Sequence, residues 1–190
     1  SFYTFQIISF LVDNRKNKEN IKFSEFFAYI TFFPQLIAGP IVRWHEIKFQ
    51  FKKIQENKHV INFYEGIKFF TVGLFLKIFI ADICGKFSSD YYKSFKFLIS
   101  ENLNINLFDY IIYNFYYTFQ IYFDFFSYSV MAVGLGYLFG IKLPKNFDEP
   151  YKSKNIKEFW RKWHITLSFW VRDYIYIPLG GSKFYIRNIF

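Results

Sequence analysis

The chain has 190 residues, of which 30 are phenylalanine and 16 are tyrosine, so aromatic residues reach 26% of the composition. This content exceeds what the core of one soluble domain needs. The net charge of +9 is confined to short polar segments between long uncharged runs, which argues against a nucleic-acid-binding surface. The single cysteine, Cys84, excludes an internal disulfide and a cysteine-based metal site.

The two ends of the chain lack the features of complete termini. The sequence begins at Ser1 and enters the apolar run Phe2–Val12, which is too short to span a bilayer and is not a signal peptide. The last residues, Tyr185–Phe190, form no closing element. We therefore expect residues 1–190 to be a single internal fragment of a larger membrane domain, truncated at both ends.

The first long uncharged run, Phe26–Val42, is interrupted by Pro34, Gly39 and Pro40, with Gln35 among them. Proline removes a backbone donor and clashes with the preceding helical turn. Because unsatisfied backbone groups are tolerated at membrane depth only where protein surrounds them, this run predicts a broken, re-entrant segment.

The next apolar run, Phe69–Ile83, contains only two charges, Lys77 and Asp82. A bilayer-spanning helix needs about 20 mainly apolar residues. We expect Tyr64–Ile83 to cross the membrane and Gly85–Phe108 to form the connection on the far side.

The block Asp109–Ile141 carries one internal charge, at Asp124. As a helix it would be about 50 Å long, against about 30 Å of hydrocarbon. It is too long for one upright span and too short for two. We expect a tilted or bent helix, with the glycines at positions 134, 136 and 140 as its weak points.

The distribution of basic residues predicts which connections between these segments lie on the same side of the membrane. Residues 15–22 contain four basic and one acidic residue, for a net charge of +3, and residues 43–58 contain five basic and two acidic residues, also +3. Residues 142–162 contain seven basic and three acidic residues (+4), whereas residues 85–108 contain three basic and two acidic residues (+1). A positive-inside bias would place the three strongly basic connections in the cytoplasm.

The final segment, Trp163–Leu179, is too short and too charged to cross. We expect it to dip into the membrane, buried in protein, and to carry His164 with it. On a straight helix Ser168 would share the face of His164 and Arg172 would lie about 80° away, whereas Asp173 would fall on the opposite face. Ionisable groups in such segments tend to be functional, although a lone buried histidine is more often a core residue.

The other two histidines are weaker candidates for a functional role. His59 lies in a polar run and is expected to be solvated, and His45 lies at the basic edge of the proline-broken run, where a structural role is favoured. No group of residues has metal-ligand spacing, and no phosphate-binding loop or nucleophile elbow is present. A soluble phenylalanine-rich helical domain is the alternative fold class.

Several long, ordered motifs resemble the membrane-bound O-acyltransferase family, and among its members the bacterial branch that acetylates alginate or peptidoglycan, with D-alanyl-lipoteichoic acid transferases as cousins. The motifs are SFYTFQ at 1–6, FFPQLIAGPIVR at 32–43, YFDFFSYS at 122–129, AVGLG at 132–136, LPKNF at 143–147, PY at 150–151, FWRKWHITLS at 159–168, and W at 170 with RDY at 172–174 and YIPLGG at 176–181.

This resemblance implies an all-α polytopic membrane protein with transmembrane and re-entrant helices and a funnel that joins donor and acceptor sides. It implies two functional histidines, of which His164 matches the first and the second lies beyond the point where the chain stops. Two positions depart from the pattern: Val130 stands where the branch has an acid, and Phe126 replaces a small residue, while Asp124 is retained.

The resemblance assigns roles to the remaining candidates. His164 is the catalytic candidate, and the expected tunnel-lining residues are Gln35, Asp124, Trp160, Trp163, Ser168, Trp170 and Arg172. Helix packing or an interfacial belt is the competing, and for the tryptophans favoured, interpretation, and interfacial anchoring competes for Arg161 and Arg172.

The implied activity is transfer of an acyl group, with acetyl expected, to hydroxyls of an extracytoplasmic polysaccharide or peptidoglycan, directly or through a periplasmic partner protein. The donor, acetyl-CoA or an acyl carrier, would be a substrate, and no bound cofactor, metal or nucleic acid is expected. The expected location is the bacterial inner membrane, with several passes. A membrane transporter or a non-catalytic scaffold of a polysaccharide-modification complex is the alternative.

Overall fold

The computed structural model describes residues 2–17, 20–36, 39–101 and 106–181, and within these ranges the chain is helical without strands. The termini at Ser1 and Tyr185–Phe190, and the pair Ile37–Ala38 of the proline-broken run, lie outside the described residues. The elements are α1 (Phe2–Asn17), α2 (Phe23–Thr31), the 3-10 turn η1 (Phe33–Gln35), α3 (Trp44–Gln55), α4 (Phe63–Leu76), the π-helical turn η2 (Lys77–Ala81), α5 (Asp82–Ser100), α6 (Leu107–Leu138), the 3-10 turn η3 (Pro150–Lys152), α7 (Ile156–Lys162), α8 (Ile165–Val171) and the π-helical turn η4 (Arg172–Tyr176).

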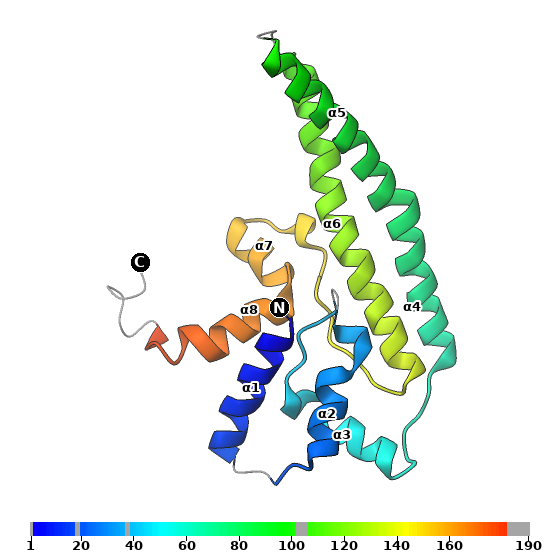
Figure 1. Ribbon diagram of the computed structural model, residues 1–190, viewed down its shortest axis with the longest axis vertical. Helices are drawn as coiled ribbons and strands as arrows, with labels where there is room; N and C mark the ends of the chain where they lie inside the picture. Colours follow the sequence, from blue (N-terminus) through cyan, green and yellow to red (C-terminus); the bar gives the residue numbers. More distant parts are fainter. Residues whose placement is uncertain (1, 18–19, 37–38, 102–105, 182–190) are drawn as a thin grey trace.

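A long helical hairpin dominates the molecule (Figure 1). Helices α4 and α5 continue into each other through η2 and lie along α6, and the short helices gather beside the half of the hairpin formed by α4 and the end of α6. Among the described residues, α6 is the one helix that is long and apolar enough to cross a membrane. We call α4 to α6 the hairpin and the remaining helices the short-helix region.

The hairpin corrects two predictions from the sequence. The predicted connection Gly85–Phe108 is helical as far as Ser100, because η2 continues the helix past Lys77 and Asp82 instead of ending it. The expected weak points at Gly134 and Gly136 lie inside an unbroken α6, and the helix ends only before Gly140, which adopts a left-handed φ of 69°.

Glycines allow the two arms of the hairpin to approach closely. A Cβ on Gly134 would lie 2.6 Å from the backbone nitrogen of Phe70, and one on Gly73 would lie 2.8 Å from the carbonyl oxygen of Ser127. Small residues that bring backbones together are typical of helix pairs in membranes, where lipid provides no hydrophobic drive between helices.

The prediction that Phe26–Val42 is broken is confirmed. Helix α2 ends at Thr31, Pro34 lies in the first turn of η1, and an extended segment leads into α3. The buried Tyr29 hydroxyl donates to the carbonyl of Val42 (2.7 Å), and the Gln35 side-chain amide donates to the carbonyl of Tyr29 (2.7 Å). These side chains satisfy two backbone carbonyl groups at the break, where no regular helix continues to supply a donor.

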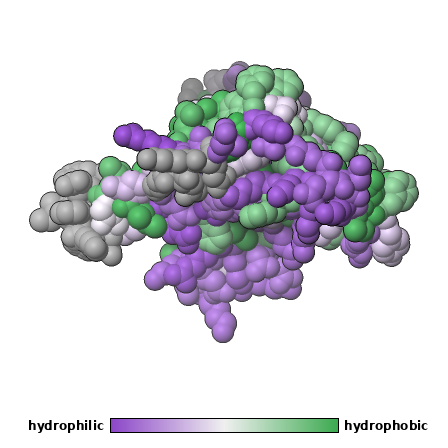
Figure 2. Space-filling model, turned by 90° about the horizontal axis from the view of Figure 1, so that it is seen from below, coloured by the Kyte–Doolittle hydropathy of each residue, from purple (hydrophilic) through white to green (hydrophobic). Residues whose placement is uncertain are grey.

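The core lies where α1, α2 and α3 meet the end of α6, and its buried residues are Phe10, Tyr29, Val42, Trp44, Ile47, Val133, Ile141 and Leu143. The described parts of the basic segments 15–22 and 43–58 lie toward one end of the molecule, and the tip of the hairpin lies at the other, whereas residues 142–162 run from the first end along α6 to α7 (Figure 1). Figure 2 shows hydrophilic side chains gathered over the first of these ends, with hydrophobic ones around them.

Candidate functional site

The histidine singled out by the sequence lies at an elbow between α7 and α8. Asn155 caps α7 by accepting a hydrogen bond from the Glu158 amide (2.9 Å), and the helix ends at Lys162. His164 then adopts a left-handed backbone (φ 45°, ψ 56°) and α8 begins at the next residue. Such a conformation is uncommon for a residue with a Cβ and persists only where the surroundings impose it.

The segment before the elbow imposes this conformation through paired backbone contacts. The amide of Asp148 donates to the carbonyl of Lys162 (3.0 Å), and the amide of Ile165 donates to the carbonyl of Asn146 (2.8 Å). His164 therefore lies between two fixed points. This corrects the expectation of one straight helix, since His164 precedes α8 and does not share a helical face with Ser168.

The His164 ring is partly buried and stands edge-on to Phe125, with ring centroids 4.7 Å apart. Its Nε2 atom is buried and has no hydrogen-bond partner among the described residues. Burial lowers the pKa of His164 from 6.5 to about 4, because desolvation disfavours the charged imidazolium. The ring is therefore neutral near pH 7 and has an unused polar atom. Asp173 is not its partner, as the sequence indicated.

A buried chain of hydrogen bonds beside the elbow was not predicted. The Thr166 hydroxyl donates to Asn146 Oδ1 (2.6 Å) and accepts from the amide of Ile41 (3.0 Å). It thereby joins α8, the segment before η3 and the proline-broken run, which are far apart in sequence. The available signal was the presence of the neutral polar residues Asn146 and Thr166 in two of the motifs that carry the family resemblance.

The three tryptophans have different surroundings. Trp163 packs against Phe147 (5.0 Å between centroids) and Tyr122 (5.7 Å), whereas Trp160 is 57% exposed. Trp170 is buried, and its indole nitrogen donates to the carbonyl of Phe5 in α1 (2.9 Å). Of the three tryptophans, Trp163 is thus the one that packs against the rings of Phe147 and Tyr122.

The side chains of the remaining candidates form no hydrogen bond with His164 among the described residues, although the Ser168 amide donates to the His164 carbonyl (3.1 Å). The Ser168 hydroxyl donates to the carbonyl of Trp160 (3.4 Å), and Gln35 is fully buried with its Oε1 atom unpaired among the described residues. Asp124 on α6 accepts a hydrogen bond from Lys77 Nζ (2.5 Å), which also reaches Asp82 (2.6 Å). Asp124 therefore belongs to an ion-pair cluster within the hairpin.

Arg172 belongs to a second polar cluster, which the sequence analysis missed. Its Nε atom donates to Asp173 (2.6 Å), and Arg43 donates to the same carboxylate (2.5 Å). The guanidinium groups of Arg172 and Arg43 hold the pKa of Asp173 below its usual value. The neighbouring Tyr174 donates to Asp13 (2.7 Å). These bonds tie η4 to α1 and to the start of α3.

The other two histidines have different surroundings. The exposed His45 ring lies 3.0 Å from Asp13, in agreement with the favoured structural role. His59 is only partly exposed, and its Nδ1 atom is buried without a partner among the described residues, because its ring packs near Gly140. The expectation that His59 is solvated is therefore wrong.

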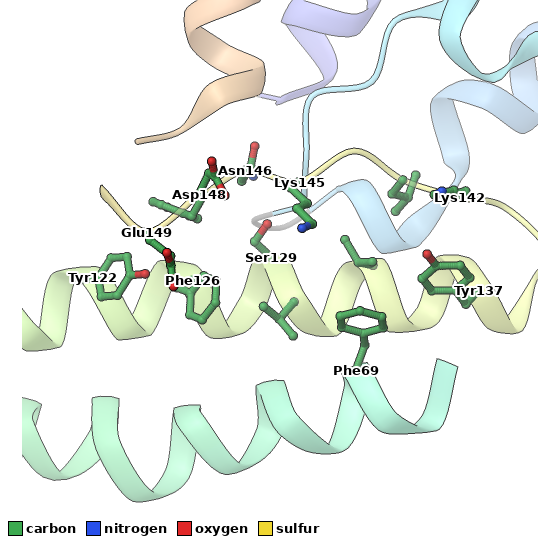
Figure 3. A pocket seen from close by; sticks show the side chains of 14 residues that line it. Phe69, Tyr122, Phe126, Ser129, Tyr137, Lys142, Lys145, Asn146, Asp148 and Glu149 are labelled. Atoms are coloured by element: carbon green, nitrogen blue, oxygen red, sulfur yellow. The ribbon is translucent and has the colours of Figure 1, made fainter. Parts of the chain in front are cut away.

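A cavity of about 390 Å³ lies between α6 and the segment that follows it (Figure 3), and its lining includes Phe147 and Tyr122, the two rings against which Trp163 packs. Both departures from the resembled pattern, Phe126 and Val130, line it, and His164 does not belong to its lining. No cluster of three or more histidine, cysteine or acidic residues suited to a metal ion occurs in the described ranges.

Comparison with known proteins gives consistent results. The model of the membrane-bound O-acyltransferase family matches residues 4–190. The chain is 37% identical to a peptidoglycan O-acetyltransferase of Helicobacter pylori, with 96% of the chain and 38% of the relative aligned. It is 39% identical to a probable alginate O-acetylase AlgI of Pseudomonas aeruginosa (96% and 34%) and 33% identical to a teichoic acid D-alanyltransferase of Bacillus subtilis (93% and 44%). The chain thus spans less than half the length of these relatives.

Proposed function

Because the chain belongs to the membrane-bound O-acyltransferase family, we propose that it forms part of an enzyme that transfers an acyl group, with acetyl expected, to hydroxyls of an extracytoplasmic polysaccharide or peptidoglycan. The three relatives are named for acylation of peptidoglycan, alginate and teichoic acid, which supports a polymer acceptor. Transfer takes place directly or through a partner protein on the periplasmic side.

The proposed location is the bacterial inner membrane, which the chain crosses more than once. Helix α6 has the length and composition of a span, and α4 with α5 lies along it over a comparable length. The basic connections 15–22 and 43–58 would face the cytoplasm, and the hairpin tip would face the other side. The broken segments around η1 and the α7–α8 elbow would enter the membrane without crossing it.

The single observation that carries the proposed site is the state of His164. A neutral imidazole with a buried, unpaired Nε2 atom is costly unless the atom is used, since a lost partner costs about 1–3 kcal/mol. The strained backbone at the same residue fixes where the ring points. These are features of a residue held ready for a ligand.

In the proposed reaction the acceptor hydroxyl oxygen attacks the acyl carbonyl carbon, and the donor's leaving group departs. A histidine base elsewhere in the full protein would take the hydroxyl proton, a contribution of about 10²–10⁴-fold in rate. His164 would hydrogen-bond a reactant through Nε2 and hold it in line. Trp163 would help exclude water, and Arg172 would attract an anionic donor, acetyl-CoA or an acyl carrier, which is a substrate and not a resident cofactor.

The proposal is tested by His164→Ala in the full chain, expressed in its own membrane system. Transfer of labelled acetyl groups to the polymer should fall at least about a hundred-fold, while membrane insertion, measured by carbonate extraction, stays unchanged. The matched control is His45→Ala, which removes an exposed imidazole bound to Asp13. Unchanged acetylation in the His164→Ala variant would show that His164 has no role in acyl transfer. Loss of polymer acetylation without any transport defect would argue against a transporter.

A further inference from the structure

The cavity between α6 and residues 142–149 has two chemically different ends (Figure 3). Its wall on the hairpin side is largely apolar and includes Phe69, Val130 and Val133. Asp148 and Glu149 lie toward the Tyr122 end, and Lys142 and Lys145 lie toward the Tyr137 end.

The basic end has unused hydrogen-bond donors. Figure 3 shows the Lys145 ammonium and the Ser129 hydroxyl directed toward each other across the cavity. Ser129 is only 3% exposed, and neither its hydroxyl nor the ammonium groups of Lys142 and Lys145 have a partner among the described residues. Lys142 and Lys145 are exposed, so their ammonium groups are available to solvent or to a group bound in the cavity.

Asn146 contributes an independent observation. It is 1% exposed, its Oδ1 atom accepts a hydrogen bond from Thr166, and its Nδ2 atom is buried and unpaired among the described residues. It also belongs to the lining of the cavity. An amide nitrogen can only donate, so the partner that it lacks is an acceptor.

The acidic end does not neutralise these lysines. The Glu149 carboxylate is occupied by Lys152 (2.7 Å), and the charges of both Glu149 and Asp148 act on Lys162, which is not part of the cavity lining. At position 130, where the resembled pattern has an acid, the wall of this cavity is a valine. The basic end is therefore left with positive charge and hydrogen-bond donors.

We propose that this cavity binds the phosphate group of an amphiphilic phosphate ester, with the phosphate between Lys142, Lys145, Ser129 and Asn146 and an apolar portion against Val130, Val133 and Phe69. Several separate donors along one cavity match the several oxygens of a phosphate ester better than the two oxygens of a flat carboxylate. The site is distinct from His164 and does not depend on acyl transfer.

The test measures binding to the purified full chain in detergent, by native mass spectrometry or calorimetry. The probes are inorganic phosphate, glycerol 3-phosphate, dihexanoyl phosphatidic acid and uncharged dihexanoylglycerol. Lys145→Gln should weaken binding of the lipid phosphate by about ten- to a hundred-fold, the range for one charge-assisted hydrogen bond. Val130→Asp should weaken it at least as much, because it adds a carboxylate beside the phosphate.

The matched control is Lys96→Gln, which removes the same charge from an exposed position on α5 and should change affinity by less than about two-fold. Thermal unfolding of each variant shows that the fold is retained. Tighter binding of the lipid phosphate than of glycerol 3-phosphate identifies a lipid headgroup as the source, and equal binding identifies a soluble ester; both support the phosphate site. Affinity that is unchanged in Lys145→Gln and Val130→Asp, or equal binding of dihexanoylglycerol, overturns it.

Discussion

The hairpin and the short-helix region satisfy the hydrogen-bonding groups of their backbones in different ways. Between Phe63 and Ser100, and again along α6, the described chain is helical without a break. In the short-helix region the helices are short, and all three non-glycine residues with positive φ in the described ranges, Asn57, Glu149 and His164, occur there. Side chains such as Thr166 then provide the hydrogen bonds that helices provide elsewhere.

This difference assigns the two regions different roles: the hairpin is structural, and the short-helix region holds the candidate functional groups. A continuous helix satisfies its own backbone and can stand in lipid, whereas irregular backbone at membrane depth requires protein or water around it. The candidate groups for function, including the unpaired atoms of Asn146 and His164, lie in the irregular region or where it meets α6. Variants in the two regions should therefore fail for different reasons.

The largest effect is expected where the hairpin arms touch. Gly134→Ala places a methyl group 2.6 Å from the backbone of Phe70, which no side-chain rotation can relieve. Overpacking of this kind should lower the free energy of unfolding by about 3 kcal/mol. Thermal and denaturant unfolding in detergent measure it.

The control for this variant is Gly85→Ala, whose new methyl group meets only the flexible side chain of Gln120. Its stability should stay within about 1 kcal/mol of wild type, because the helix propensity of alanine offsets a small adjustment. Equal losses in the two variants would show that the arms are not held by close backbone contact.

A smaller loss is expected from Thr166→Val in the short-helix region. The substitution keeps the shape of the side chain but leaves Asn146 Oδ1 and the Ile41 amide without their partner. We expect about 2 kcal/mol of destabilisation, since each buried unsatisfied group costs about 1–3 kcal/mol. Thr31→Val, which removes a hydroxyl bound only to its own helix at Phe27, should cost less than about 0.5 kcal/mol. Hydrogen exchange at the Ile41 amide would locate the effect.

The next prediction concerns pH and His164. Its pKa is about 4 in the fold and 6.5 in the unfolded chain, so the unfolded state binds more protons between these values. Stability should therefore fall as pH drops from about 6.5 to about 4, relative to a variant without the imidazole. The full shift corresponds to at most about 3 kcal/mol, and partial exposure of the ring reduces the expected loss to about 1–2 kcal/mol.

His164→Asn is the reference variant, because asparagine tolerates the left-handed backbone at this position. Apparent melting temperatures of the two proteins should agree near pH 7 and diverge below about pH 6.5. Parallel curves would show that the ring is already paired or solvated in the full protein.

The smallest effect is expected from Lys77→Met in the hairpin. It leaves Asp124 and Asp82 without their shared ammonium, but both carboxylates are about half exposed in the described chain, so the loss should be about 1 kcal/mol. The double variant Lys77→Met/Asp124→Leu should recover part of it. A loss of unfolding free energy well above that of Thr166→Val would show that the polar groups of the hairpin, too, are shielded from solvent in the full protein.

Much of the helical architecture could be predicted from the sequence. The uncharged runs indicated the apolar helices, and Pro34 indicated the break after α2. The extension of α5 to Ser100 could not be predicted, because its polar residues lie on a helix supported by α6 and not by its own composition.

The candidate site was only partly predictable. The motif around His164 identified the residue, but its helical spacing indicated the wrong neighbours, because the elbow at His164 breaks the 3.6-residue period. Asn146 and Lys145 gave no periodic signal, since they lie in an extended segment whose partners are remote in sequence.

The sequence by itself therefore determined the class of protein and most of its helices and singled out His164 as a candidate, because composition, apolar run length and motifs are local properties of the chain. Only the tertiary structure decided which polar groups are buried together and which remain unpaired. Those pairings join residues as distant as Ile41 and Thr166, and the free energy of such a contact depends on desolvation by the whole fold.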